Sequence, residues 1–236
     1  MILKIDPQIT EKYPDLRIGV VVAKGVDNEA TPAQLETIKL EAENNLRKQI
    51  ALENLASHPH IDAWRQTYKS FGVKPKKHRP TAEALIRRIL KGDSLPKISP
   101  IVDLYLANEL DNLLPIGGYD LDKVDHFVSL EICNGGADFL PMGSSDFEKT
   151  QPGEVIYKDS LRILTRRWNY RDCDHTKITN KTTNFALFAE AALPQITNQA
   201  LEKATKELQS ALSILKHSEI KIFIFEPAKD GNACKF

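Results

Sequence analysis

The 236-residue sequence lacks the features that mark several classes of protein. Its three cysteines, Cys133, Cys173 and Cys234, are far apart and have no CxxC or histidine-ligand spacing. We therefore expect neither a structural zinc site nor a disulfide framework. No apolar run is long enough to span a bilayer, and the first residues lack the basic start of a secretory signal. The expectation is a cytoplasmic protein with reduced thiols, no membrane partner, no metal and no other cofactor.

The sequence also lacks net charge, because 32 Lys and Arg residues balance 32 Asp and Glu residues. No global field steers the chain toward nucleic acid, so any RNA contact must come from local clusters, and we expect no DNA partner. A hydrophobic share of 42% and a charged share of 27% are ordinary for a globular protein of this length, which can bury a substantial core.

Common catalytic motifs are absent as well. The sequence contains no HExxH, no nucleophile elbow, and no Walker or dinucleotide-binding fingerprint. If the chain is an enzyme, water or a hydroxyl group of the substrate is the expected attacking group.

The order of periodic segments predicts an α+β fold. Residues 18–23 predict a buried strand, and Thr31, Pro32 and Gln34 predict a capped helix start at residue 31. That helix is predicted over residues 31–56, and further helices over 61–71, 80–92, from 99 onward and over 199–217. Further strands are predicted over residues 127–132, 154–157, 161–168, 184–188 and 220–225. Because no regular βαβ alternation appears, α+β is favoured. We expect one domain, residues 1–236, with residues 1–70 as a mostly helical N-terminal flank.

A basic loop precedes the predicted helix at residue 80. Lys74, Lys76, Lys77 and Arg79 surround His78 there. A basic loop that leads into a helix N-terminus can hold phosphate, although a solvated loop has the same composition. The neighbouring cations disfavour protonation of His78, so a neutral imidazole is expected.

A second cluster joins arginines to aromatic residues. Arg166 and Arg167 stand beside Trp168, Asn169 and Tyr170. On a strand, residues 166, 168 and 170 would share one face. An arginine beside an aromatic ring can bind phosphate while the ring stacks on a base. The alternative is a tryptophan in the core with arginines in surface ion pairs.

Two glycine pairs, Gly117-Gly118 and Gly135-Gly136, provide permissive backbone. Either pair could bring main-chain N–H groups close to a ligand, as an oxyanion site requires. Taken singly, each pair is better explained by a tight turn.

From residue 98 to residue 123 the sequence resembles, without a gap, the B3/B4 domain of the phenylalanyl-tRNA synthetase beta subunit. Motifs that resemble the free-standing relatives of that domain are His78-Arg79-Pro80, Gly117-Gly118, Gly153-Glu154-Val155, Arg166-Arg167-Trp168-Asn169 and Asp174-His175-Thr176-Lys177. The resemblance covers about residues 71–190. It implies an α+β domain with a curled, mostly antiparallel sheet, a barrel-like core and flanking helices. In the synthetase it implies hydrolysis of tyrosine wrongly attached to the phenylalanine tRNA.

The sequence departs from the synthetase pattern at its functional positions. The editing histidine of the synthetase falls on Gly117, an asparagine falls on Leu106, and a glutamate falls near residues 172–174. The residues that select tyrosine in the synthetase are therefore not carried over.

The leading hypothesis is a tRNA-associated domain that hydrolyses mis-charged aminoacyl-tRNA in trans, as an ester hydrolase and not as a complete tRNA ligase. In this hypothesis the catalytic residues are His78 and Asp103. The substrate-binding residues are Arg79, Gly117, Gly118, Arg166, Arg167, Trp168 and Asn169. Asp103 has a structural alternative at its helix start. A non-catalytic RNA- or amino-acid-binding module and a small-molecule enzyme unrelated to tRNA remain the competing hypotheses.

Overall fold

The apolar run at residues 18–23 lies at the centre of a four-stranded antiparallel sheet. In the computed structural model, which describes residues 1–236, β2 (Arg17–Lys24) pairs with β11 (Glu219–Phe225) and with β10 (Phe185–Ala191). Beyond β10 lies β3 (Ile116–Asp120), so the order is β11-β2-β10-β3. All of β10 and seven of the eight residues of β2 are buried, as expected for strands covered on both faces.

A second sheet has six strands and is antiparallel except where β1 runs parallel to β4. Its order is β12 (Ala233–Lys235), β1 (Ile2–Ile5), β4 (Val128–Ile132), β7 (Val155–Lys158), β8 (Ile163–Arg166) and β9 (Arg171–Asp172). A hairpin of β5 (Asp138–Phe139) and β6 (Glu148–Lys149) stands apart. Each larger sheet ends in two edge strands, so neither closes into a barrel. The α+β class is confirmed, and the barrel-like core is not.

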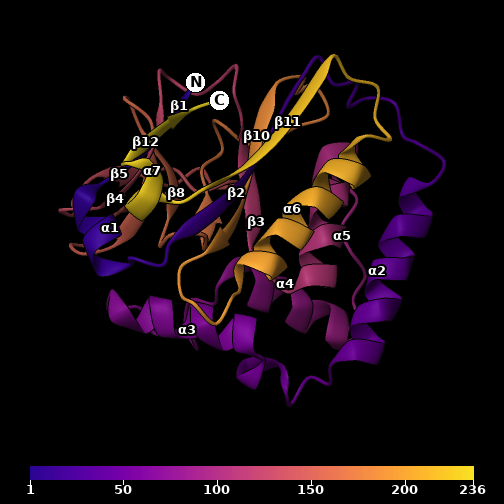
Figure 1. Cartoon of the computed structure of the whole chain (residues 1–236), viewed down its shortest axis with the longest axis horizontal. Coiled ribbons are helices and arrows are strands. Elements are labelled where there is room, and N and C mark those ends of the chain that lie inside the picture. The colour runs from indigo at the N-terminus through magenta and orange to yellow at the C-terminus, as the bar shows by residue number, and fades with distance from the viewer.

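The three longest helices lie together on one side of the four-stranded sheet (Figure 1). There α6 (Asn198–Leu212) packs on β2 and β11, and α5 (Pro100–Asn112) packs against both α6 and α2 (Leu35–Gln49). The other helical segments are α1 (Pro7–Lys12), the 3₁₀ turn η1 (Leu55–Ser57), α3 (Pro59–Ser70), α4 (Thr81–Leu90) and α7 (Pro227–Asp230). Two helix starts agree closely with the sequence: Pro80 is the N-cap of α4, and the Ser99 hydroxyl accepts the Val102 N–H at the start of α5.

The predicted helix over residues 31–56 is wrong at both ends. Residues 31 and 32 belong to no helix and residues 33 and 34 form a turn, so Thr31 caps nothing, and α2 begins at Leu35 without a side-chain cap. The helix stops at Gln49 because Ile50 is extended, and the chain then folds back so that Leu55 joins a small apolar cluster with Leu46. Burial of Leu55 thus outweighs the helical tendency of this segment.

Both ends of the chain belong to the six-stranded sheet. β1 pairs with β12, and the N-terminal ammonium group donates to the carbonyl of Phe236 at 3.0 Å, which agrees with the neighbouring chain ends in Figure 1. Residues 1–70 contain α1, α2, η1 and α3, and they also contribute β1 and β2 to the two sheets. No helix combines the length and the apolar character needed to cross a membrane.

Candidate functional site

A pocket of about 320 Å³ lies where the two larger sheets meet α4 and α5. Its volume is at the small end of the range of ligand-binding pockets. Its 23 lining residues are Thr81, Ala84, Leu85, Arg88, Pro96, Ile98, Val102, Tyr105, Leu106, Ile116, Gly117, Gly118, Tyr119, Met142, Tyr157, Thr165, Trp168, Asn169, Tyr170, Arg171, Asp172, Phe188 and Glu190.

Strand register explains why these residues converge. In the six-stranded sheet Tyr157 lies opposite Thr165, and Thr165 lies opposite Asp172, so all three share one face. In the four-stranded sheet Gly117 lies opposite Phe188, and Glu190 is two residues further along the same face. The two rows face each other across the pocket.

The floor of the pocket is aromatic. The rings of Tyr119, Tyr157 and Phe188 have centroids 6.0 to 6.1 Å apart. Trp168, which is fully buried, packs edge-on against Trp64 with ring centroids 5.3 Å apart. Such a floor favours an apolar, planar or cationic ligand group.

Glu190 is a buried carboxyl group at one end of this floor. One oxygen accepts from the Tyr157 hydroxyl at 2.5 Å and from the Trp168 indole N–H at 2.8 Å, and the other accepts from the Asn169 amide at 3.2 Å. All three donors are neutral. Burial raises the pKa of Glu190 to about 7 despite these hydrogen bonds.

Asp172 is the second carboxyl group in the pocket. Its Oδ1 accepts from the Thr165 hydroxyl at 2.6 Å, and Thr165 in turn lies 2.6 Å from the Tyr119 hydroxyl. Since the single Thr165 proton points to Asp172, the Tyr119 hydroxyl donates to Thr165. Burial raises the pKa of Asp172 to about 6. Neither Asp172 nor Glu190 forms an ion pair with a lysine or an arginine.

The glycine pair at residues 117–118 forms part of a strand, not a turn. Both residues belong to β3 and neither has a left-handed φ. A Cβ on Gly117 would meet nothing within 4 Å, whereas a Cβ on Gly118 would stand 2.0 Å from the carbonyl oxygen of Ala186. Gly118 is therefore required by close packing, and Gly117 leaves open space in the pocket.

Four of the nine residues predicted from sequence line this pocket: Gly117, Gly118, Trp168 and Asn169. The last two lie in a turn, because β8 ends at Arg166 and both Arg167 and Trp168 adopt left-handed backbone. The predicted strand alternation through residue 170 is therefore wrong. Asn169 bridges Glu190 and the Tyr68 hydroxyl, which donates to Asn169 Oδ1 at 2.8 Å.

Asp103 lies outside the pocket. Its side chain is 1% exposed, pairs with the Lys39 ammonium group at 3.0 Å and accepts the Ile98 N–H at 2.9 Å. These contacts tie α5 to α2 and to the segment that precedes α5. These contacts support a structural role for Asp103 at the start of α5. Because Asp103 does not line the pocket, it is out of reach of a ligand bound there.

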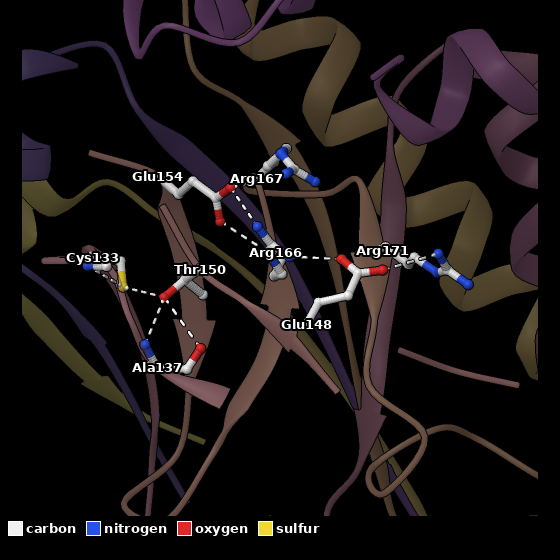
Figure 2. A network of polar contacts seen from close by, with 9 residues as sticks. Cys133, Ala137, Glu148, Thr150, Glu154, Arg166, Arg167 and Arg171 are labelled. Carbon is white, nitrogen blue, oxygen red and sulfur yellow. Dashed lines mark hydrogen bonds and ion pairs between the residues drawn. The ribbon is translucent and has the colours of Figure 1, made fainter. Parts of the chain in front are cut away.

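Arg166 and Arg167 do not line the pocket, and both bind carboxylates of a neighbouring cluster (Figure 2). Arg166 is 3% exposed and binds Glu154 with two N–H groups, at 2.6 and 2.9 Å, and Glu148 with another at 2.7 Å. Arg167 binds Glu154 at 3.0 Å. The charges of both arginines are thus committed within the protein. Arg167 also lies over the ring of the pocket residue Tyr170, with its guanidinium carbon 5.3 Å from the ring centroid.

His78 and Arg79 lie beside the pocket without lining it. The His78 ring meets the pocket residue Tyr170 edge-on with centroids 5.0 Å apart. Burial, followed by the charges of Arg167 and Lys77, lowers the pKa of His78, which agrees with the expected neutral imidazole. Arg79 is 40% exposed and stands 3.8 Å from Glu83.

The cations that do reach the pocket are Arg88 and Arg171. Their side chains are 57% and 43% exposed, and their nearest carboxylates are 3.4 and 3.7 Å away. Glu190 could have been found from sequence, as the one carboxylate inside the apolar run of residues 184–191. The resemblance places a glutamate of the synthetase near residues 172–174, but no pattern in the surrounding residues singles out Asp172. No group of three or more His, Cys, Asp or Glu side chains is arranged to hold a metal ion.

Comparison with known proteins gives a family for the part of the chain that forms the pocket. The B3/4 domain family matches residues 63–214, which include every pocket residue. Among solved structures, an N-terminal fragment of the phenylalanyl-tRNA synthetase beta-subunit from Pyrococcus horikoshii is similar, with 11% identity and a TM-score of 0.46. The alignment covers 89% of this chain and 48% of that fragment, so this chain spans about half its length. No curated protein sequence matches the chain.

Proposed function

We propose that this chain, which belongs to the B3/4 domain family, is a tRNA-associated domain that hydrolyses mis-charged aminoacyl-tRNA in trans. The observation that supports this most is the presence of two carboxyl groups, Asp172 and Glu190, in an aromatic pocket with no cationic partner. A ligand that carries an ammonium group would supply the missing charge.

Burial raises the pKa values of both carboxyl groups in the pocket. Burial makes the ionised forms of Asp172 and Glu190 costly, and a nearby cation would lower both pKa values again. Aromatic faces such as those of Tyr119 and Phe188 also attract an ammonium group. Every aminoacyl ester carries an α-ammonium group, so the aminoacyl end of a charged tRNA has the required chemistry.

The size of the pocket restricts what enters it. About 320 Å³ accommodates a small-molecule group and not a folded RNA. The tRNA itself would remain outside, where Arg88 and Arg171 reach the pocket with partly exposed side chains. The basic loop that contains Lys74 and Lys76 adjoins Tyr170 through His78. Cations placed in this way can neutralise phosphates of the terminal nucleotides.

A non-catalytic amino-acid- or RNA-binding module is the second candidate. Gly117 stands where the resemblance places the editing histidine of the synthetase, and the space beside it is open. Loss of that side chain favours binding without hydrolysis. His78 and Arg79 stay candidate rim residues, and their replacement by alanine would show whether they contribute.

Hydrolysis is tested with a panel of correctly and wrongly charged tRNAs. Each is incubated with the wild-type protein, and release of the amino acid is followed against the spontaneous rate. The proposal expects faster release from at least one mis-charged tRNA and loss of that release at high salt, because phosphate contacts weaken with salt. tRNA binding without release from any member would establish the binding module instead. Salt-insensitive action on a small ester alone would contradict a tRNA substrate.

A further inference from the structure

We infer that Asp172 is the general base of this pocket and that the Gly118 N–H and the Tyr105 hydroxyl hold the oxyanion that forms on the ester carbonyl. This inference rests on the proposed function and assigns its catalytic groups. It replaces Asp103, which is committed to Lys39. It also differs from a role for Glu190, whose oxygens already accept three hydrogen bonds.

Asp172 has one oxygen fixed and one oxygen free. Thr165 donates to Oδ1, and the Tyr119 hydroxyl holds Thr165 in place. No protein group donates to Oδ2, and the residue lines the pocket. A carboxylate oriented through one oxygen can accept a proton from water at the other.

The Gly118 N–H is available because of strand register. The hydrogen bonds at the two ends of β3 fix its alternation: Leu121, just after the strand, donates to the carbonyl of Asn184, and Pro115, just before it, accepts from the N–H of Glu190. The even-numbered residues therefore point to the outer edge, where no further strand pairs.

The N–H groups of residues 116 and 120, on either side of Gly118 along this edge, point to α5 and to the segment that follows β9. The Ile116 N–H donates to Glu109 of α5, and the Asp120 N–H donates to the carbonyl of Thr176. Gly118 lies between them with no partner for its N–H, in the gap between α5 and the segment that follows β9. Asp172 ends β9 and borders the same gap.

Tyr105 approaches from the other side of this gap. It lies one turn before Glu109 on α5, it lines the pocket, and its hydroxyl has no protein partner. Burial, together with the charges of Asp172, Glu109 and Asp103, raises the pKa of Tyr105, so it keeps its proton and stays a donor. Two donors and one base thus border a single small space.

The reaction is an ester hydrolysis. The oxygen of a water molecule attacks the ester carbonyl carbon while Asp172 takes one of its protons. The carbonyl electron pair moves to the oxygen, which the Gly118 N–H and the Tyr105 hydroxyl stabilise. The intermediate then collapses, the bond from carbon to the ribose oxygen breaks, and that oxygen takes the proton back from Asp172. The products are the free amino acid and uncharged tRNA, and Asp172 returns to its starting form.

The pH dependence follows from the groups around Asp172. Glu190 from β10, Glu109 and Tyr105 from α5 and Tyr119 from β3 face it, and Arg171 precedes it in the chain. With a pKa of about 6, Asp172 is mostly ionised at neutral pH. The value of kcat/KM should therefore rise as pH increases through about 6 and then level.

The test measures deacylation of the tRNA that the wild-type protein acts on, over a range of pH, after subtraction of the spontaneous rate. Asp172→Asn should lower kcat/KM by roughly 100-fold or more and abolish the rise near pH 6. Tyr105→Phe should lower kcat by about 100-fold with little change in KM. Asp174→Asn is the matched control, because Asp174 lies two residues away outside the pocket and pairs with Lys177. Its kcat/KM should be that of the wild type.

The outcomes separate the two proposals. If the wild-type protein deacylates a tRNA and Asp172→Asn, folded by circular dichroism, keeps the rate or the pH rise, Asp172 is not the base. If Asp172→Asn does not fold, a Tyr105→Phe variant with wild-type kcat overturns the oxyanion assignment. If the wild-type protein deacylates no tRNA, the proposed function fails and this inference fails with it.

Discussion

Two charged regions of this protein lie close together in sequence but have opposite properties. Around Glu154, every buried charge is matched: Arg166 and Arg167 bind its carboxylate, and Arg166 also binds Glu148 (Figure 2). In the pocket, Asp172 and Glu190 receive hydrogen bonds from neutral groups only. The carboxylates of the first region are paired with arginines, and those of the second have no cation paired with them.

The difference between the two regions indicates that a charged residue is a candidate for ligand binding when no other group of the protein neutralises its charge. Sequence clustering pointed to the arginines at residues 166 and 167, yet their partners are inside the protein. The uncompensated carboxyl groups are better candidates for ligand contact, because a ligand can supply what the fold does not.

The largest expected effect is the loss of the Glu154 cluster. Arg166→Ala removes the main partner of a buried carboxylate, which should lower the free energy of unfolding by about 3 to 5 kcal/mol. Arg171→Ala removes an exposed arginine 3.7 Å from Glu148 and should cost no more than about 1 kcal/mol. Urea unfolding of both variants measures the contrast. Equal losses of unfolding free energy would show that the buried Arg166 and the exposed Arg171 contribute equally to stability.

The glycine pair gives the next contrast, within the pocket itself. Gly118→Ala places a methyl group against the carbonyl oxygen of Ala186 and should destabilise the fold by about 3 kcal/mol. Gly117→Ala meets open space and should change stability by less than about 1 kcal/mol. Thermal unfolding followed by circular dichroism distinguishes them. A large loss for Gly117→Ala would mean that this part of the pocket is not open.

The uncompensated carboxyl groups should make stability depend on pH. The pKa of Glu190 is raised from 4.5 to about 7, so the folded state binds the proton more tightly than the unfolded state. Its contribution is fully present below pH 4.5 and is lost as pH rises through about 7, a change of about 3 kcal/mol.

Glu190→Gln isolates this contribution. The stability of the wild-type protein minus that of the variant should fall by about 3 kcal/mol between pH 4.5 and pH 7.5. Urea titrations at both pH values give the difference. A difference that is constant with pH would show that Glu190 is compensated in the folded protein.

The smallest effect is expected at the rim. Arg171→Ala should weaken tRNA binding a few-fold and reduce the slope of log K against log salt by about 0.7 to 0.9. Lys206→Ala is the control, since Lys206 is exposed on α6, which does not line the pocket. Binding is measured by fluorescence anisotropy at several salt concentrations. An unchanged slope for Arg171→Ala would remove this arginine from the tRNA contacts.

Local sequence patterns were sufficient for most elements of the fold. Ser99 and Pro80 mark helix starts by capping chemistry, and the apolar run at residues 18–23 marks a central strand. The end of α2 could not be read in this way, because burial of Leu55 depends on contacts with α3 and α4. Strand β3 was missed because its two glycines read as a turn, whereas packing against Ala186 requires Gly118.

Only part of the site could be predicted from the sequence, because the direction of a side chain depends on contacts between distant segments. Trp168 and Asn169 stand out by residue type and do line the pocket. Arg166 stands out equally, but its direction depends on where Glu154 and Glu148 fold. The resemblance places a glutamate of the synthetase only approximately, near residues 172–174, and strand register is what puts Asp172 beside Thr165. The pairing of distant strands determines which of these side chains enter the pocket, and local sequence patterns do not encode that pairing.

The central claim is that the pocket receives the cationic end of an aminoacyl group. Calorimetry at pH 6 with a non-hydrolysable 3′-aminoacylamino-adenosine, in buffers of different ionisation enthalpy, tests it most directly. The account predicts binding with release of about one proton, since the ligand cation lowers the pKa values of Asp172 and Glu190. A matched analogue without the amino group should bind more weakly and release none. Equal binding of the two analogues, or binding without proton release, would contradict the account.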